Sequence, residues 1–441
     1  MKMPVRPKTL RELMAQVSLV RLKVILNVVE SPTVDGKYRH WDKLRYLETP
    51  PGLSHPEWWL GLKLRRSGSS PIPLRDKAGA SFRLNMVDPL PEILHHVDSQ
   101  AQGAIQQPEP LTNPATRDQY LVRSLIEESI TSSQLEGAST TRVVARKMLR
   151  ENRAPRNRGE RMIFNNYQTM QHILEIRDRE ITPSMICEIH RMVTDGTLDD
   201  PSGAGRFRRS DENIVVEDVE GQVLHDPPPA DELERRALEM CAFANEKGRG
   251  EFLHPMVRSM ILHFWLAYDH PFVDGNGRTA RALFYWSMLK QGYWVFEYIS
   301  ISKLILRAPT KYERAFLETE TDENDLTYFL IYHASIIRRA IDELDQDIDR
   351  HVRELAEAEK DLAGLAVLNH RQRELMSHAL RHPGERYTTE THRNSHRVAY
   401  ETARSDLMDL VDRGLLQKKK HGKSWVFSPA VDLTERLQRL D

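Results

Sequence analysis

The spacing of apolar residues predicts that the middle of the chain is mostly helical. Between residues 116 and 137 apolar side chains recur at intervals of three and four, as on one face of a helix that ends at Gly137. Similar patterns predict further helices at 160–176, 183–194, 231–246, 256–269, 279–290 and 326–362. From Asn213 to His225 the pattern alternates around Glu220-Gly221, which predicts a β-hairpin. We therefore expect a mainly α fold with one β-hairpin flap.

The first part of the chain has a different pattern. Residues 1–100 mix short apolar runs with turn-forming residues, which predicts a small mixed domain whose core includes Trp41, Trp58 and Trp59. A polar stretch that begins at Gly103, GAIQQPEPLTNP, is typical of a linker. The central helical domain is then expected at residues 110–345.

The last part of the chain has the element order of a winged helix. A helical linker is expected at 346–364, followed by a winged-helix domain at 365–441. The pattern there predicts a helix at 369–381, a helix at 396–413, a Gly-Leu-Leu strand, a basic loop KKKHGK and an apolar strand WVF. A basic loop beside arginine-bearing helix 396–413 could contact DNA phosphates, although many winged helices bind proteins.

Composition narrows the class of protein. The 63 Lys and Arg residues nearly cancel the 64 Asp and Glu residues, which argues against a protein that coats a polyanion. Cys187 and Cys241 are too few for a disulfide framework and lack metal-site spacing. The chain shows no signal-peptide pattern and no apolar run of about 20 residues, so we expect a soluble, cytoplasmic protein without membrane contact.

The densest chemical signal is the segment HPFVDGNGRTAR, which runs from His270 to Arg281 between two apolar helices. Glycine and asparagine residues before a helix allow several backbone N–H groups to converge at its positive end. Arg278 and Arg281, three residues apart on the first turn, add two planar donors on the same side. The segment is therefore expected to cradle an anion with several phosphate groups.

Two other residues of this segment suggest what the cradle does. A carboxylate, Asp274, would repel phosphate unless a hard cation lay between them, so it implies Mg²⁺. His270 stands at the end of the preceding helix, and an imidazole can accept a proton from a hydroxyl at neutral pH. A lone histidine or Asp-Gly-Asn-Gly turn is usually structural, but here all parts of phosphate chemistry lie within twelve residues.

The segment resembles the motif of the Fic family, HPFx(D/E)GN(G/K)RxxR, at every fixed position. The resemblance extends over about residues 110–345, including the flap and the Gly205-Arg206-Phe207-Arg208 approach to it. It implies an all-helical core with a β-hairpin flap. It also implies an enzyme that transfers AMP from ATP, its co-substrate, to a Ser, Thr or Tyr hydroxyl of a target protein or of itself. The flap would hold the target segment as an added strand.

The resemblance also implies a role for each motif residue. His270 would deprotonate the hydroxyl and Asp274 would ligate Mg²⁺. The α-phosphate would be held by Asn276 and by the backbone of Gly275 and Gly277, the β-phosphate by Arg278 and the γ-phosphate by Arg281. Lys311-Tyr312 stands where many relatives have Tyr-Tyr, so Tyr312 is expected either at the nucleotide or in the core.

A second family element lies upstream. The segment from Ser132 to Gly137, SSQLEG, matches the inhibitory motif (S/T)xxxE(G/N), here at the end of a predicted helix at 117–137. If Glu136 pairs with Arg281, that guanidinium is unavailable to the γ-phosphate, and the carboxylate also repels the nucleotide. The resemblance thus implies an enzyme that is autoinhibited by Ser132 and Glu136.

Three alternatives stay open at this stage. The same glutamate could help remove AMP from a modified target, so the direction of the reaction is not fixed. The chain could also be a DNA-binding regulator whose Fic core senses nucleotides. The motif alone does not fix which group is transferred. The target protein is unidentified, and a second copy of the chain and DNA both remain candidate partners.

Overall fold

The computed structural model describes residues 2–101, 114–151, 153–218, 220–246, 252–365, 367–421 and 424–439. The chain forms two compact units. Residues 1–103 and 124–341 make up the first, and residues 104–123 and 342–441 make up the second. The linker expected from Gly103 falls mostly on residues 102–113, outside the described residues. No described helix is both long and apolar enough to cross a lipid bilayer.

The N-terminal part of the first unit has its own apolar cluster. Trp58 and Trp59 are buried in it and Trp41 packs against it, so the predicted aromatic core is confirmed. This part is also tied to the central helices, because the Tyr38 hydroxyl donates a hydrogen bond of 2.5 Å to Asp325. Its elements are α1 (Leu10–Met14), α2 (Leu19–Val28), α3 (Trp41–Leu44), α4 (His55–Arg65), β1 (Ser70–Arg75), β2 (Ser81–Leu84) and α5 (Leu90–Ala101).

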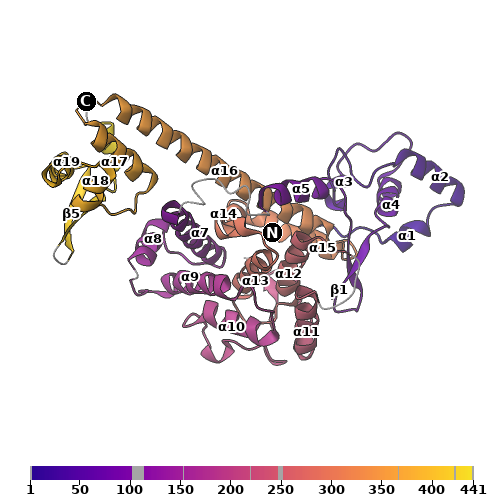
Figure 1. Ribbon diagram of the computed structural model, residues 1–441. Helices are drawn as coiled ribbons and strands as arrows, with labels where there is room; N and C mark the ends of the chain where they lie inside the picture. Colours follow the sequence, from indigo (N-terminus) through magenta and orange to yellow (C-terminus); the bar gives the residue numbers. More distant parts are fainter. Residues whose placement is uncertain are drawn as a thin grey trace. The chain divides into compact units, whose positions relative to one another are not determined.

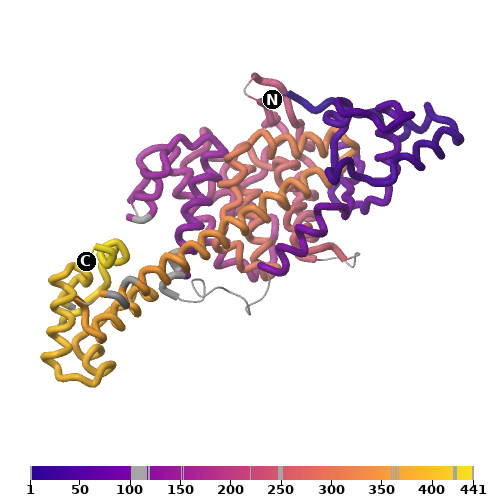
Figure 2. The backbone as a smooth tube through the Cα atoms, turned by 90° about the horizontal axis from the view of Figure 1, so that it is seen from above, coloured from indigo at the N-terminus to yellow at the C-terminus, as the bar shows by residue number. Residues whose placement is uncertain are grey.

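The central helices surround a buried pair, α12 (Pro255–Asp269) and α13 (Asn276–Lys290). Apolar residues lie on every side of α12, as expected for a helix covered all round. In both views this pair lies between the N-terminal elements and α8 to α10 (Figure 1 and Figure 2). The surrounding helices are α7 (Pro114–Leu135), α8 (Arg142–Arg150), α9 (Arg158–Ile176), α10 (Pro183–Thr194), α11 (Leu233–Ala244), α14 (Ile301–Leu306), α15 (Pro309–Thr321) and α16 (Thr327–Gly364), with 3-10 turns η1 (Pro201–Gly203), η2 (Ala230–Glu232) and η3 (Trp294–Glu297).

The mainly α fold and its single central flap agree with the sequence patterns. Strands β3 (Val216–Glu217) and β4 (Val223–His225) pair antiparallel, and Gly221 lies between them with a φ of 77°. The start of α13 was predicted at 279, but the helix begins at Asn276 because Gly275 caps it in a left-handed conformation. Helices α8, α14 and α15 were not predicted.

The second unit contains the rest of α16 and the C-terminal elements. These are α17 (His370–Arg381), α18 (Thr389–His396), α19 (Tyr400–Asp412), β5 (Leu416–His421), β6 (Ser424–Pro429) and α20 (Leu433–Leu437). They pack on an apolar cluster that includes Met376, Leu407 and Phe427. Tyr387 forms a β-bridge with Phe427, which adds a short third edge to the hairpin.

Two predictions for this unit were wrong. The helix expected at 396–413 begins only at Tyr400, because Arg397, with a left-handed φ of 51°, ends a separate helix, α18, that was not predicted. The basic segment that starts at Lys418 lies in strand β5, where Lys418 stacks over the Trp425 ring at 4.2 Å, while residues 422 and 423 lie outside the described residues. The assignment to a winged helix and its contact with DNA stay predictions.

Candidate active site

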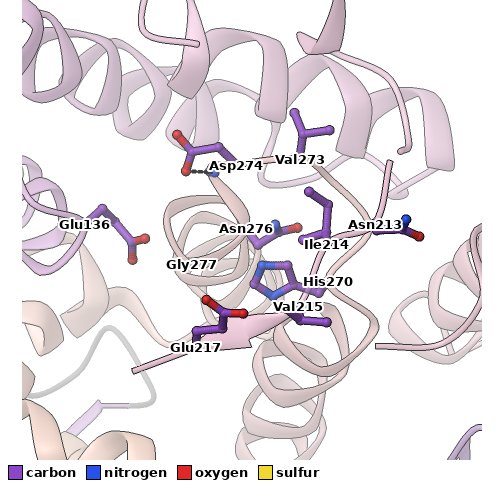
Figure 3. A pocket seen from close by; sticks show the side chains of 11 residues that line it. Glu136, Asn213, Ile214, Val215, Glu217, His270, Val273, Asp274, Asn276 and Gly277 are labelled. Atoms are coloured by element: carbon purple, nitrogen blue, oxygen red, sulfur yellow. Dashed lines mark hydrogen bonds between the residues drawn. The ribbon is translucent and has the colours of Figure 1, made fainter. Parts of the chain in front are cut away.

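His270 is placed by the end of α12. Its backbone is left-handed, with a φ of 44°, and its N–H donates to the carbonyl of Leu266 at 3.0 Å. A non-glycine residue in this region is uncommon and needs support. Arg208 supplies it: its Nε donates to the His270 carbonyl at 3.0 Å, and its backbone N–H donates to the carbonyl of Pro271 at 2.9 Å. The resulting turn directs the imidazole into a cavity (Figure 3).

The surroundings of His270 keep its imidazole neutral. Burial and the nearby charge of His225 lower the pKa of His270 to about 4. The ring is therefore uncharged at neutral pH and has a lone pair available to accept a proton. This is the protonation state that a general base requires before the reaction.

The cavity has a volume of about 380 Å³. The flap forms one wall and the motif loop another, and Glu136 reaches it from the end of α7 (Figure 3). Its lining residues are Glu136, Asn213, Ile214, Val215, Glu217, His270, Val273, Asp274, Gly275, Asn276 and Gly277.

The motif loop is closed by the side chain of Asn276. Its Oδ1 accepts a hydrogen bond from the N–H of Phe272 at 3.0 Å, and its Nδ2 donates to the carbonyl of Phe272 at 2.8 Å. Both polar atoms of the amide are thus bonded within the loop, and only 2% of the residue is exposed. We assign Asn276 a positioning role here, and its expected contact with the α-phosphate stays a prediction.

Gly275 is required by two separate constraints. Its φ is 81°, and a Cβ built on it would lie 2.6 Å from Cγ2 of Thr194. We expect Gly275→Ala to lower the free energy of unfolding by about 2–4 kcal/mol, since it adds overlap to backbone strain. Gly36 has a similar φ of 66° but no neighbour within 4 Å, so Gly36→Ala should cost only about 1 kcal/mol. Equal losses in urea unfolding of the two variants would contradict the proposed overlap.

Arg278 is buried without all of its hydrogen-bond partners. It is 1% exposed, and its Nη1 donates to the carbonyl of Val193 at 2.8 Å. Its Nε and Nη2 have no hydrogen-bond partner among the described residues. Burial lowers its pKa, and unsatisfied donors of a buried cation are costly. Nη2 lies 3.7 Å from Oδ1 of Asp274, so these groups already face one carboxylate and retain the capacity to donate hydrogen bonds to an anion.

Arg281, by contrast, binds the end of α7 through Nε and Nη2. Its Nε donates to the Ser132 hydroxyl at 2.8 Å, and its Nη2 donates to the Ser132 carbonyl at 3.0 Å and to Glu136 at 2.8 Å. The pairing of Glu136 with Arg281 is thus present in the structure, and Ser132 binds the same guanidinium. Glu136, just beyond α7, thus accepts a hydrogen bond from Nη2 of Arg281, and that N–H group is not available to another ligand.

Glu136 is held as a carboxylate over the start of α13. Burial alone would raise the pKa of Glu136, but the charges of Arg281 and Arg278 outweigh it, and the pKa is lowered. A Cβ on Gly277 would overlap Glu136 Oε1, so the carboxylate lies directly against this glycine. Negative charge is favourable at a helix N-terminus, which is where the cradle was predicted to hold phosphate.

His190 is a site residue that the sequence patterns did not reveal. Its Nε2 donates to the carbonyl of Asp274 at 2.8 Å, while its Nδ1 accepts from the N–H of Gly205 at 3.0 Å. The ring also stacks on Phe272, with centroids 3.7 Å apart. Burial lowers the pKa of His190 to about 4, which keeps it neutral for both bonds. A single histidine in a predicted helix gave no signal of this role.

Tyr312 lies beside the site but does not line the cavity. Its hydroxyl bonds to Nε2 of His263 at 2.8 Å, and Nδ1 of His263 contacts His333 at 3.0 Å. His263 and His333 are both fully buried. The contact of Tyr312 with a nucleotide stays a prediction.

Comparison with known protein families and sequences supports the assignment of the motif to the Fic family. The model of the Fic/DOC family matches residues 180–288. Two relatives named protein adenylyltransferase Fic align with part of the chain. The protein from Nematostella vectensis is 30% identical over 38% of this chain and 34% of its own length, and that from Drosophila melanogaster is 38% identical over 26% and 21%. The alignments thus span about a third or less of these relatives.

Comparison with solved structures supports the fold. A Fic family protein from Desulfovibrio desulfuricans has a TM-score of 0.51 and 16% identity, over 79% of this chain and 98% of the other. At this identity the likeness concerns the fold alone. The segment that the Fic/DOC family model matches, residues 180–288, contains His190, the flap and all twelve motif residues. Residues 180–288 of this chain are therefore a Fic domain.

Proposed function

We propose that this chain is a protein adenylyltransferase that transfers AMP from Mg-ATP to a Ser, Thr or Tyr hydroxyl of a target protein or of itself. One observation carries the proposal. A neutral, half-buried His270 opens into the same cavity as the N-terminus of α13, and the first turn of that helix carries Arg278, whose Nε and Nη2 have no hydrogen-bond partner among the described residues. A base for a hydroxyl and a site for polyphosphate are thus adjacent. The names of the aligned relatives agree with this activity.

The chain's own residues suggest how the transfer proceeds. His270 accepts the proton of the target hydroxyl, whose oxygen forms a bond to the α-phosphorus as the bond to pyrophosphate breaks. The Nε and Nη2 groups of Arg278, which lack a hydrogen-bond partner among the described residues, stabilise charge on the β-phosphate, and Arg281 can reach the γ-phosphate once Glu136 releases it. Asn276 and His190 keep the loop in place during the reaction.

Asp274 suits a magnesium ion that is held mainly by the substrate. Its side chain is 46% exposed at the cavity, and its Oδ1 accepts the N–H of Gly275 at 2.5 Å. Among the described residues no group of three or more His, Cys, Asp or Glu side chains could hold a metal ion. Mg²⁺ commonly binds through one carboxylate, phosphates and water, so this single carboxylate fits. The ion would neutralise phosphate charge when bound.

The flap is proposed to position the target. Asn213, Ile214 and Val215 line the cavity ahead of β3, so a strand added beside the flap would bring its hydroxyl close to His270. Backbone pairing of this kind needs few special side chains, which leaves the identity of the target open.

A labelling experiment tests the function. The Glu136→Gly protein, with Mg²⁺ and a cell extract, should incorporate label from the α-phosphate of ATP into protein and none from the γ-phosphate. Mass spectrometry of the labelled residue should then find AMP on a hydroxyl side chain. Incorporation of γ-label would show phosphate transfer, and absence of both labels would contradict the proposal.

A further inference from the structure

The root of the flap is fixed by a buried histidine that lies outside the motif. His225 is the last residue of β4 and is 8% exposed. Its Nε2 lies 2.7 Å from the carbonyl oxygen of Tyr268, and its Nδ1 lies 2.8 Å from Oε2 of Glu320. His225 therefore joins the flap to the end of α12 and to α15 at the same time.

The two contacts determine the protonation state of the ring. A carbonyl oxygen and a carboxylate oxygen both accept hydrogen bonds, and neither can donate one. Both ring nitrogens must then carry a proton for both bonds to form, so His225 is an imidazolium cation. Burial opposes this charge, but the bond to Glu320 outweighs it, and the pKa of His225 is raised.

Other charged groups surround the ring. Asp226 follows it on the same segment and Asp269 lies on α12, and both favour the cation. His270 also faces it, and the charge of His225 lowers the pKa of that base. Lys77, at the turn of β1 and β2, pairs with Asp226. The cation therefore has three acidic neighbours, Glu320, Asp226 and Asp269, and its own charge lowers the pKa of His270.

We infer that protonated His225 is a latch that holds the flap against the end of the helix bearing His270 and sets the electrostatics of that base. The latch itself depends only on the two hydrogen bonds. Its effect on catalysis rests on the proposed function. Because the folded protein favours the charged ring, the latch is complete at low pH and is lost as pH rises through the pKa of His225 in the folded state. The flap should therefore loosen in alkaline solution.

The first test measures the latch without any activity. Nitrogen-15 NMR of histidine-labelled protein should show that His225 titrates at a higher pH than an ordinary histidine, with its signal assigned by its loss in His225→Gln. Glu320→Gln should lower that pKa, because it removes the partner charge. A pKa at or below that of an ordinary histidine would overturn the inference.

The second test measures the flap. His225→Gln should raise amide hydrogen exchange across the flap several-fold at neutral pH and leave α13 unchanged. The matched control is His172→Gln on α9, since His172 also contacts a glutamate, at 3.6 Å, but lies far along the chain from the flap. Unchanged flap exchange in His225→Gln would also overturn the latch.

The third test concerns the base. In the Glu136→Gly background, His225→Gln should shift the acidic limb of the kcat/KM profile upward by about one pH unit, because His270 loses a neighbouring cation. It should also raise KM for the target more than it lowers kcat. An unshifted limb would overturn the effect on His270. If no transfer is detectable in either protein, the proposed function fails, and the NMR and exchange results still decide the latch.

Discussion

Replacing His270 by alanine is expected to reduce AMP transfer by about 10²- to 10⁴-fold, the usual contribution of a general base. The imidazole is the only histidine among the lining residues of the cavity, and its lowered pKa of about 4 leaves it neutral and able to accept a proton. Alanine removes this acceptor and leaves Arg278 and the loop in place. Single-turnover rates of label transfer in the Glu136→Gly background would measure the loss.

The control for this variant is nucleotide binding. Since His270 contacts the hydroxyl in the proposed mechanism, ATP affinity measured by calorimetry should change by less than about threefold. His172→Ala, which changes a half-buried histidine on α9, should retain full transfer. A His270→Ala protein that transfers label at a near-normal rate would show that another group accepts the proton.

Replacing Glu136 by glycine is expected to raise transfer by about 10- to 100-fold. The carboxylate holds Nη2 of Arg281 at 2.8 Å and occupies space against Gly277, so its loss frees both a donor and volume for phosphate. A charge-assisted hydrogen bond is worth about 1.5–3 kcal/mol, which corresponds to this range of rates. Initial rates at saturating ATP, compared with the natural sequence, would measure the gain.

A second variant separates charge from volume. Glu136→Gln keeps the side chain against Gly277 but removes the charge that Arg281 and the nucleotide experience. We expect a transfer rate between those of the natural sequence and Glu136→Gly. A rate equal to that of Glu136→Gly would assign the inhibition to charge alone. Glu151→Gln, which changes an exposed acid at the end of α8, should have no effect. Absence of any gain in Glu136→Gly would refute the inhibitory role.

The sequence predicted the residues that carry the site better than the contacts that position them. The motif is contiguous, so the loop and first turn of α13 bring His270, Asp274 and Arg278 together by local geometry alone. His190 and Arg208 reach the motif loop, and His225 reaches the end of α12, from elsewhere in the chain. These contacts depend on how distant segments pack in the folded protein. Periodicity carries no information on such pairs.

The prediction of helix bounds from the sequence has the same limit. Helix α10 was predicted at its observed bounds because its apolar period is regular and Thr182 caps it. The start of α13 and the break between α18 and α19 were missed, since both depend on single residues in left-handed conformations, Gly275 and Arg397. Apolar spacing predicts which face of a helix is buried, but it is insensitive to one backbone angle that ends or begins the helix.

The contact between Glu136 and Gly277 links two positions that are far apart in the sequence. A Cβ at 277 would overlap Oε1 of Glu136, so a side chain there would force the carboxylate to move. The motif that this segment resembles permits glycine or lysine at that place. A lysine there would push the Glu136 carboxylate away from the N-terminus of α13, so in a chain with that residue the glutamate would not be held against the helix end as it is here.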